Sequence, residues 1–181
     1  MIAFFEHPIH PKYIAIAVES CGGGWEKASG SSMCYKKFDN KISFLDAERH
    51  CQTEGGNLAR ISSYEENALV GNIGGSGYFW IGLWSGNEGK CSRDKNSWVW
   101  TDGTAGTGFS RWGNAASGQK WNPPDCHVGL SKGMAVFFNY PHRNNRWEDG
   151  EIATARPFVC GISEEKLGKC VALNYMEVTS P

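Results

Sequence analysis

The sequence lacks an excess of charge of one sign, a long apolar run and a paired metal-binding cysteine motif. Its 181 residues carry 18 basic and 19 acidic side chains, so the formal net charge is −1. No basic run stands out, which argues against a surface for nucleic acid or anionic membranes. No segment approaches the ~20 apolar residues of a membrane-spanning helix. The length fits one domain with short extensions and allows a real hydrophobic core.

The cysteine spacing predicts disulfide bonds. The seven cysteines form no CxxC or CxxH pair, which fits zinc ligation poorly and a disulfide framework well. Because seven is odd, at least one thiol stays free or pairs between chains. A secreted or extracellular protein is therefore expected, although residues 1–18 make a poor signal peptide and no Asn-X-Ser/Thr site occurs. A cytosolic protein with reduced thiols is the alternative.

Two stretches predict helices, and the remaining apolar runs predict strands. Residues 43–56 offer Ser43 as an N-cap, with Asp46 in the position of a capping box. Residues 62–73 follow, with Ser62 or Ser63 as the N-cap. Strands are expected in six short runs bounded by Gly, Asn, Asp or Pro: MCYKKF, YFWIGLW, SWVWT, HVGL, MAVFF and RPFVCG.

This order of elements predicts an α+β domain whose first helix is tied to its last strand. A Cys51–Cys160 bridge would close a loop of roughly a hundred residues, worth ~4–5 kcal/mol on the chain-entropy model. A Cys21–Cys34 bridge would close a short N-terminal hairpin, worth ~3 kcal/mol on the same model. The 8 Trp and 23 Gly favour a compact, loop-rich protein with large rings in its core.

Taken together, these features resemble the C-type lectin-like domain. The matching stretches follow the family's order: CGGGWEKASGSSMCYKKF, the helix with Cys51, GGNLARISSYEENALV, WIGL, WVWTDGT, FSRW, DCHV, RWEDG and PFVCG. WIGL alone is a weak match, whereas the whole series is specific. The resemblance implies a disulfide-stabilised α+β double-loop domain at residues 21–161, between an N-terminal extension, 1–20, and a C-terminal tail, 162–181.

The resemblance also implies a long loop that carries the ligand-binding residues, here Thr101–Cys126. An irregular loop has little hydrogen-bonded order of its own, so buried rings must anchor it. Four tryptophans are therefore expected in the core: Trp80, Trp98, Trp100 and Trp147. An exposed Trp112 or Trp121 would be able to stack on a sugar ring without any metal.

A calcium site of the family's type is only partly present. Sugar-binding members use a Glu-Pro-Asn or Gln-Pro-Asp triplet, an acid two residues before the loop cysteine, and a Trp-Asn-Asp motif. Here the triplet position falls near 116–118, Ala-Ser-Gly, and Pro124 stands in the acid's place. The motif has become Trp147-Glu148-Asp149. Because calcium takes about six to eight oxygens, two carboxylates alone bind it weakly.

The WNPPDC stretch offers replacement ligands. It carries Asn122 and Asp125, with Pro123 or Pro124 forming a rigid turn that a cis peptide can provide. Calcium is the one cofactor considered, with Asp125, Glu148 and Asp149 as its ligands. The predicted ligand-binding set joins these acids to loop residues: Trp112, Trp121, Asn122, Asp125, Glu148 and Asp149. The alternative is a solvated acidic hairpin tip beside a core tryptophan.

The partner of Cys126 departs from the family pattern. Members normally pair the loop cysteine with one between the Trp-x-Asp motif and the final strand, but residues 150–159 contain none. Cys91 and Cys170 are the alternatives. If Cys91 is the partner, Cys170 is the odd thiol and is available for a disulfide-linked dimer.

Three classes of function fit these residues. The first is an extracellular module that binds a glycan through the long loop, with a degenerate or absent calcium site. The second is a calcium-independent module that binds a protein ligand. The third is an enzyme using Asp125-Cys126-His127, but adjacent strand residues point to opposite faces, so a bridged structural cysteine is favoured. The sequence therefore predicts a non-enzymatic recognition module, glycan-binding first and protein-binding second.

Overall fold

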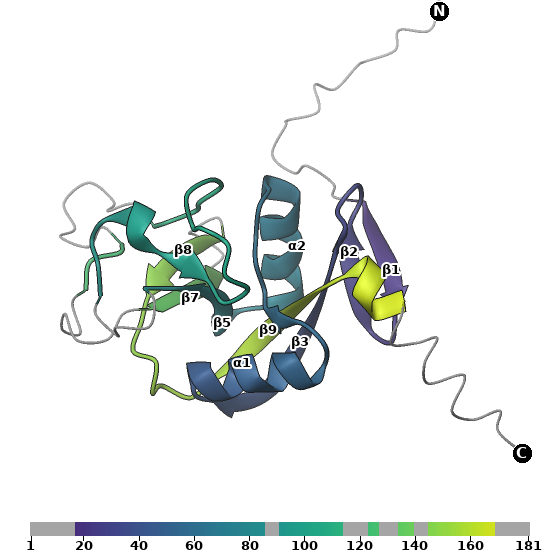
Figure 1. Cartoon of the computed structure of the whole chain (residues 1–181), viewed down its shortest axis with the longest axis horizontal. Coiled ribbons are helices and arrows are strands. Elements are labelled where there is room, and N and C mark those ends of the chain that lie inside the picture. Colours follow the sequence, from purple (N-terminus) through teal and green to yellow (C-terminus); the bar gives the residue numbers. More distant parts are fainter. Residues whose placement is uncertain (1–16, 86–90, 114–122, 127–133, 140–144, 169–181) are drawn as a thin grey trace, which may run out of the picture.

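A computed structural model describes residues 17–85, 91–113, 123–126, 134–139 and 145–168 (Figure 1). The predicted HVGL strand, together with Trp121, Asn122 and Cys170, lies outside these residues. The strands are β1 (Val18–Gly22), β2 (Trp25–Ala28), β3 (Met33–Ile42), β4 (Asn57–Leu58), β5 (Gly77–Trp84), β6 (Val99–Trp100), β7 (Met134–Asn139), β8 (Arg146–Asp149) and β9 (Arg156–Ser163). The helices are α1 (Phe44–Thr53), α2 (Tyr64–Gly74) and the 3-10 turn η1 (Lys95–Ser97).

Both long helices begin where their capping residues predict. The Ser43 side chain accepts a hydrogen bond from the backbone N–H of Asp46, and Ser63 accepts one from Glu66. Each hydroxyl thereby satisfies one of the backbone donors that the first helical turn leaves unpaired. The N-cap of α2 is thus Ser63 rather than Ser62. Within the described residues, no helix is long and apolar enough to cross a membrane.

The two ends of the domain pair within one sheet. Its strand order is β1-β2-β3-β9-β5-β7-β8, with β4 added beside β9 and β6 beside β5. β3 and β9 run antiparallel from Met33↔Ser163 to Ile42↔Arg156. This pairing of the N- and C-terminal strands is consistent with the double-loop domain that the resemblance implies. The sheet includes residues 18 and 163, so it reaches slightly beyond the predicted limits of 21 and 161.

Three disulfides fasten this sheet to the elements around it. Cys51–Cys160 joins α1 to β9, and Cys21–Cys34 joins β1 to β3, as the sequence predicts. The third bridge, Cys91–Cys126, selects the first of the two alternatives for the loop cysteine. Six of the seven cysteines are therefore paired within the chain.

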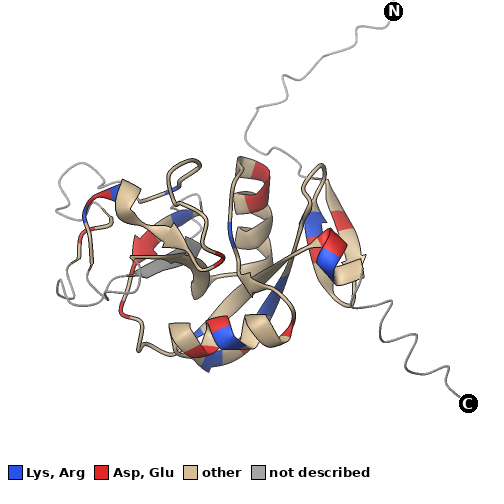
Figure 2. Ribbon diagram, in the orientation of Figure 1, with Lys and Arg blue, Asp and Glu red and all other residues tan. Residues whose placement is uncertain are grey.

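Alternate residues of β9 serve two separate hydrophobic cores. Phe158 and Cys160 pack with Phe44 and Ala47 of α1 in one core. Val159, which lies between them and points to the other face, packs with Leu69 of α2 in the second core. The helices accordingly lie on opposite sides of β9, as Figure 1 shows. Basic and acidic residues are interspersed over the ribbon, with acidic ones at the start of α2 (Figure 2).

The WIGL stretch of β5 has a steric reason for its glycine. A Cβ added at Gly82 would lie 2.6 Å from the Leu58 carbonyl oxygen and 2.9 Å from Oγ1 of Thr101. The Gly82 N–H donates to the Ala59 carbonyl, and its own carbonyl accepts from the Thr101 N–H. A side chain at this position would separate β5 from β4 and from Thr101 at the start of the long loop.

Candidate binding site

The long loop returns to the sheet at Cys126, beside the edge strand β8. The Cys91–Cys126 bridge joins this return point to the segment that follows β5, across a sequence separation of 35 residues. Nearby, the Arg93 Nε–H donates to the Asp125 carbonyl at 3.2 Å. The peptide between Pro123 and Pro124 is cis, as the sequence analysis allowed. The end of the loop is thus fixed by bonds to the segment that follows β5.

Asp149 is the principal acceptor for the end of the loop. Its side chain is only 6% exposed. Oδ1 accepts the backbone N–H of Asp125 at 2.9 Å, and Oδ2 accepts that of Cys126 at 3.0 Å. Hydrogen bonds from backbone donors to a buried carboxylate are charge-assisted and therefore strong. The Asp149 carboxylate consequently serves to position the loop terminus.

Two sulfur atoms also lie close to this carboxylate without forming a metal site. Potential ligand atoms of Cys91, Cys126 and Asp149 lie within 4.8 Å of one another. The two sulfurs are bonded to each other, however, so neither is the thiolate that a metal requires. The same bond removes Cys126 as a nucleophile, which counts against the Asp125-Cys126-His127 enzyme hypothesis.

The three acids predicted to hold calcium do not converge as a set. Glu148 and Asp149 follow one another in β8, where burial alternates, with Asp149 buried and Glu148 half-buried. Burial lowers the pKa of Arg156, and the negative charge of Glu148 offsets part of that effect. Asp125 meets Asp149 through its own backbone N–H. Among the described residues, these three acids therefore do not fit a calcium-binding cluster.

Trp112 corrects the expectation of an exposed ligand-stacking ring. It is 4% exposed and packs edge-on against Trp98, with ring centroids 4.9 Å apart. It also contacts Trp147 at 6.1 Å, and Trp100 contacts Trp147 at 5.7 Å. The core roles predicted for Trp98, Trp100 and Trp147 are confirmed, as is that of Trp80, which is fully buried. The prediction that Trp112 stacks on a ligand is therefore wrong, because this ring is buried as another anchor of the irregular loop.

An amide clamp, not predicted from the sequence, holds α2 against β8. The buried Asn67 accepts the indole N–H of Trp147 at 2.8 Å and donates from Nδ2 to the Asn145 carbonyl at 3.1 Å. One side chain thus satisfies two partners, one in β8 and one just before it. The ring of Tyr64, in the first turn of α2, lies next to Phe109 of the loop segment 109–113.

A cationic and aromatic surface results, and sequence reasoning did not find it. The Tyr64 side chain is 64% exposed, and its ring meets that of Phe109 edge-on at 5.0 Å. The Arg111 guanidinium carbon lies 5.2 Å from the centre of the Tyr64 ring. No spacing in the sequence indicates this contact, because Tyr64 and Arg111 come from different segments. We call Tyr64, Phe109, Arg111 and Arg146 the arginine–tyrosine patch.

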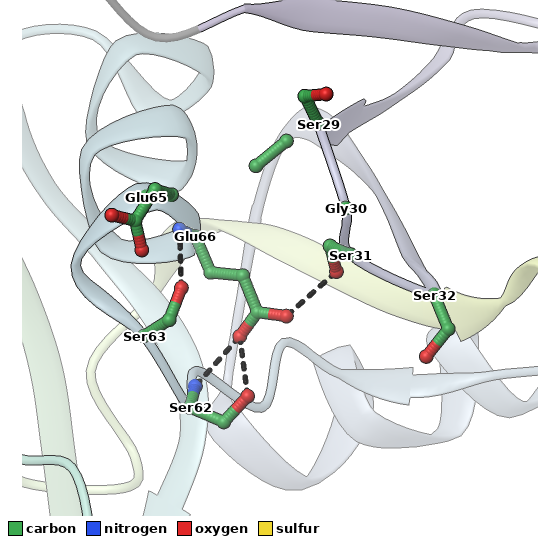
Figure 3. Close-up of a pocket in the computed structure, with 9 residues that line it drawn as sticks. Ser29, Gly30, Ser31, Ser32, Ser62, Ser63, Glu65 and Glu66 are labelled. Carbon is green, nitrogen blue, oxygen red and sulfur yellow. Dashed lines mark hydrogen bonds between the residues drawn. The ribbon is translucent and has the colours of Figure 1, made fainter.

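A polar pocket of about 390 Å³ lies on another side of α2, against the turn between β2 and β3 (Figure 3). Glu66 is 5% exposed and points toward the serines of this pocket. Its Oε1 accepts the Ser31 hydroxyl at 2.7 Å, and its Oε2 accepts both the N–H and the hydroxyl of Ser62 at 2.7 Å. The carboxylate is thus engaged in joining the helix to the hairpin.

This fold and site define a C-type lectin-like domain, and comparison with known proteins agrees. The model of the lectin C-type domain matches residues 40–162, so the chain belongs to that family. C-type lectin domain family 10 member A of Homo sapiens is 30% identical over 141 residues, which cover 77% of this chain and 39% of that protein. Lactose-binding lectin l-2 of Anguilla japonica is 29% identical over 153 residues, covering 83% of each.

A solved structure supports the fold assignment independently. The crystal structure of a calcium-independent type II antifreeze protein matches with a TM-score of 0.60 and 24% identity, covering 81% of this chain and 96% of that chain. At this identity the likeness shows the fold alone. The predicted disulfide-stabilised α+β lectin-like fold is confirmed. The chain spans 39% of the human relative's length, so that protein's full organisation does not transfer.

Proposed function

We propose that this domain is an extracellular recognition module that binds a glycan through the long loop without calcium. The class of ligand is supported by the relative named as a lactose-binding lectin, which the chain matches over 83% of that protein. The three disulfides favour an oxidising compartment, which supports an extracellular location. The calcium-independent antifreeze protein has a similar fold, which supports a stable loop without the ion.

One observation carries the calcium-free part of the proposal, namely the pair of hydrogen bonds that Asp149 accepts. A family-type site would need this carboxylate as a metal ligand, together with several other oxygens. Here each of its oxygens already accepts a backbone N–H from the loop terminus. The Cys91–Cys126 bridge fixes the same terminus covalently. Internal bonds therefore perform the loop-ordering role that a bound ion would otherwise have.

The residues that contact the glycan are assigned as follows. Trp121 and Asn122, which lie outside the described residues, remain the predicted contacts of the long loop. Of the predicted acids, Asp149 positions the loop terminus that follows them in the chain, through the backbone N–H groups of Asp125 and Cys126. A flat or aromatic loop surface that binds a protein is the second candidate, favoured by the exposed Tyr64 ring beside the loop.

A glycan array probed in millimolar calcium and again in EDTA tests the proposal. We expect binding to at least one glycan that EDTA leaves unchanged, and we expect Trp121→Ala to weaken it because a stacking ring is lost. Leu45→Ala, which removes an exposed apolar side chain from α1, is the control and should bind as the wild type does. Binding abolished by EDTA would contradict the calcium-free mechanism. Binding to no glycan in either buffer would favour the protein-ligand candidate.

A further inference from the structure

The arginine–tyrosine patch brings two guanidinium groups onto neighbouring segments. Trp112 and Trp147 form a parallel bridge, in which the Trp147 N–H donates to the Arg111 carbonyl and the Gly113 N–H donates to the Trp147 carbonyl, both at 2.8 Å. Arg111 and Arg146 each precede a bridged tryptophan. Because residues alternate across extended segments, burial of the two indoles leaves the two arginines on the partly exposed side.

These two positive charges affect each other. Burial, and then the positive charge of Arg111, lower the pKa of Arg146, while Tyr64 raises it. Arg146 also donates from Nη1 to the Trp112 carbonyl at 3.4 Å, which keeps its side chain near the loop. Like charges held close together cost free energy, and an anion bound between them relieves that cost.

Two aromatic rings, those of Tyr64 and Phe109, lie beside the Arg111 guanidinium group. The Tyr64 ring is exposed and is held by its contacts with Phe109 and Arg111. Phe109 in turn packs against Trp147, with ring centroids 6.0 Å apart. A ring fixed in this way loses little conformational freedom when it stacks on a flat apolar surface such as one face of a sugar.

The buried acid of α2 is engaged away from the patch. Glu66, two residues after Tyr64, accepts hydrogen bonds from Ser31 and Ser62 in the serine pocket (Figure 3). The patch combines cationic forks, which match sulfate and carboxylate groups, with an exposed ring.

We infer that the arginine–tyrosine patch binds the acidic groups of a sulfated or carboxylated saccharide. This inference rests on the proposed glycan-binding function and names the class of glycan. The two guanidinium groups bind the anionic substituents, and the Tyr64 ring stacks on the sugar that carries them. The calcium-free mechanism is compatible with it, since the charge that attracts the ligand comes from the protein itself.

Binding to three immobilised probes tests the inference: a heparin-derived oligosaccharide, a sialylated oligosaccharide that carries carboxylate only, and neutral lactose. We expect the wild type to bind at least one acidic probe more tightly than lactose, and added salt to weaken that binding. Preference for the heparin-derived probe would identify sulfate as the group that the patch binds. Comparable binding to both acidic probes would show that a carboxylate is sufficient. Equal binding to lactose would overturn the inference and leave the proposed function in place.

Variants then locate the site. Arg111→Gln with Arg146→Gln should weaken acidic-probe binding at least about tenfold, because hydrogen bonds to charged groups are lost. Each single variant, Arg111→Gln or Arg146→Gln, should also weaken it, whereas Arg49→Gln, a matched loss of one charge at a side chain 69% exposed on α1, should leave it unchanged. Changing Arg111 and Arg146 to lysine instead keeps the positive charge and controls for unfolding of the glutamine variant. The lysine variant should retain part of the affinity. An equal loss in Arg49→Gln, or none in the double variant, would overturn the assignment.

Discussion

Replacing Asp149 provides the sharpest test of the structure, because its carboxylate accepts two backbone hydrogen bonds from the loop terminus. Asp149→Ala would remove both acceptors and leave the N–H groups of Asp125 and Cys126 without their partner. The bond to Cys126 is buried, whereas the bond to Asp125 is partly buried, so water can replace the latter more readily. The loss should therefore be large, with most of it from Cys126.

The magnitude follows from the two bonds. Hydrogen bonds to a charged group contribute about 1.5–3 kcal/mol each, which gives roughly 3–6 kcal/mol for the pair. Removing a buried charge also recovers part of its desolvation cost, so we expect a net loss of about 3 kcal/mol. For a domain of this size that corresponds to a melting temperature lower by roughly 6–12 °C. Asp149→Asn retains one acceptor oxygen and should lie between the wild type and Asp149→Ala.

Urea and thermal unfolding followed by tryptophan fluorescence measure this loss. Glu148→Gln is the matched control, since it removes the same charge from the adjacent, half-buried residue and should cost less than about 1 kcal/mol. Millimolar calcium should leave the wild-type melting temperature unchanged. If Asp149→Asn cost no more than Glu148→Gln, the structural role would be refuted. If calcium raised the wild-type melting temperature and the effect required Asp149, the carboxylate would be a metal ligand instead.

Two further predictions concern the third disulfide and a buried phenol. Changing both Cys91 and Cys126 to Ser should lower the free energy of unfolding by about 3–4 kcal/mol, measured in urea, and peptide mapping that linked Cys126 elsewhere would contradict the bridge. Burial, and then the negative charge of Glu66, raise the pKa of the Tyr35 phenol, so the neutral phenol stabilises the fold fully below about pH 10 and this stabilisation is lost as the pH rises further. At neutral pH, Tyr35→Phe should be about 1 kcal/mol less stable than the wild type, because the hydrogen bond to the Arg60 carbonyl is lost. Above about pH 10 the free energy of unfolding should fall less steeply in Tyr35→Phe than in the wild type, and parallel alkaline profiles of the two proteins would refute this.

Local patterns were sufficient to predict most of the fold. Ser43 as an N-cap, with Asp46 three residues on, located the start of α1, because capping depends on residues three apart in the chain. The bridge between Cys51 and Cys160 was predictable because the order of elements ties the first helix to the last strand. The partner of Cys126 was left open between Cys91 and Cys170, since both are distant in sequence and only three-dimensional proximity selects one.

The candidate site was harder to predict, because its residues meet across the fold. Asp149 was expected as a metal ligand, but its oxygens accept N–H groups from a loop terminus 23 and 24 residues away in sequence. Trp112 was expected to be exposed, yet the tertiary structure packs it against Trp98. The contact of Tyr64 with Arg111 was not predicted at all, because the two residues lie in α2 and in the long loop, which only the folded chain brings together.

The sequence by itself determined the two helices, the bridged hairpin, the tie between α1 and β9, and the membership of a tryptophan-rich lectin-like family. The helices follow from capping and local patterns, the predicted bridges from the order of the elements, and the family membership from the resemblance of the ordered motifs. Only the tertiary structure decided which polar groups stay exposed and which bond to each other. The physical reason is that a buried carboxylate or amide must find partners wherever the packed chain supplies them. Asp149 and Asn67 find theirs on segments that no local pattern connects.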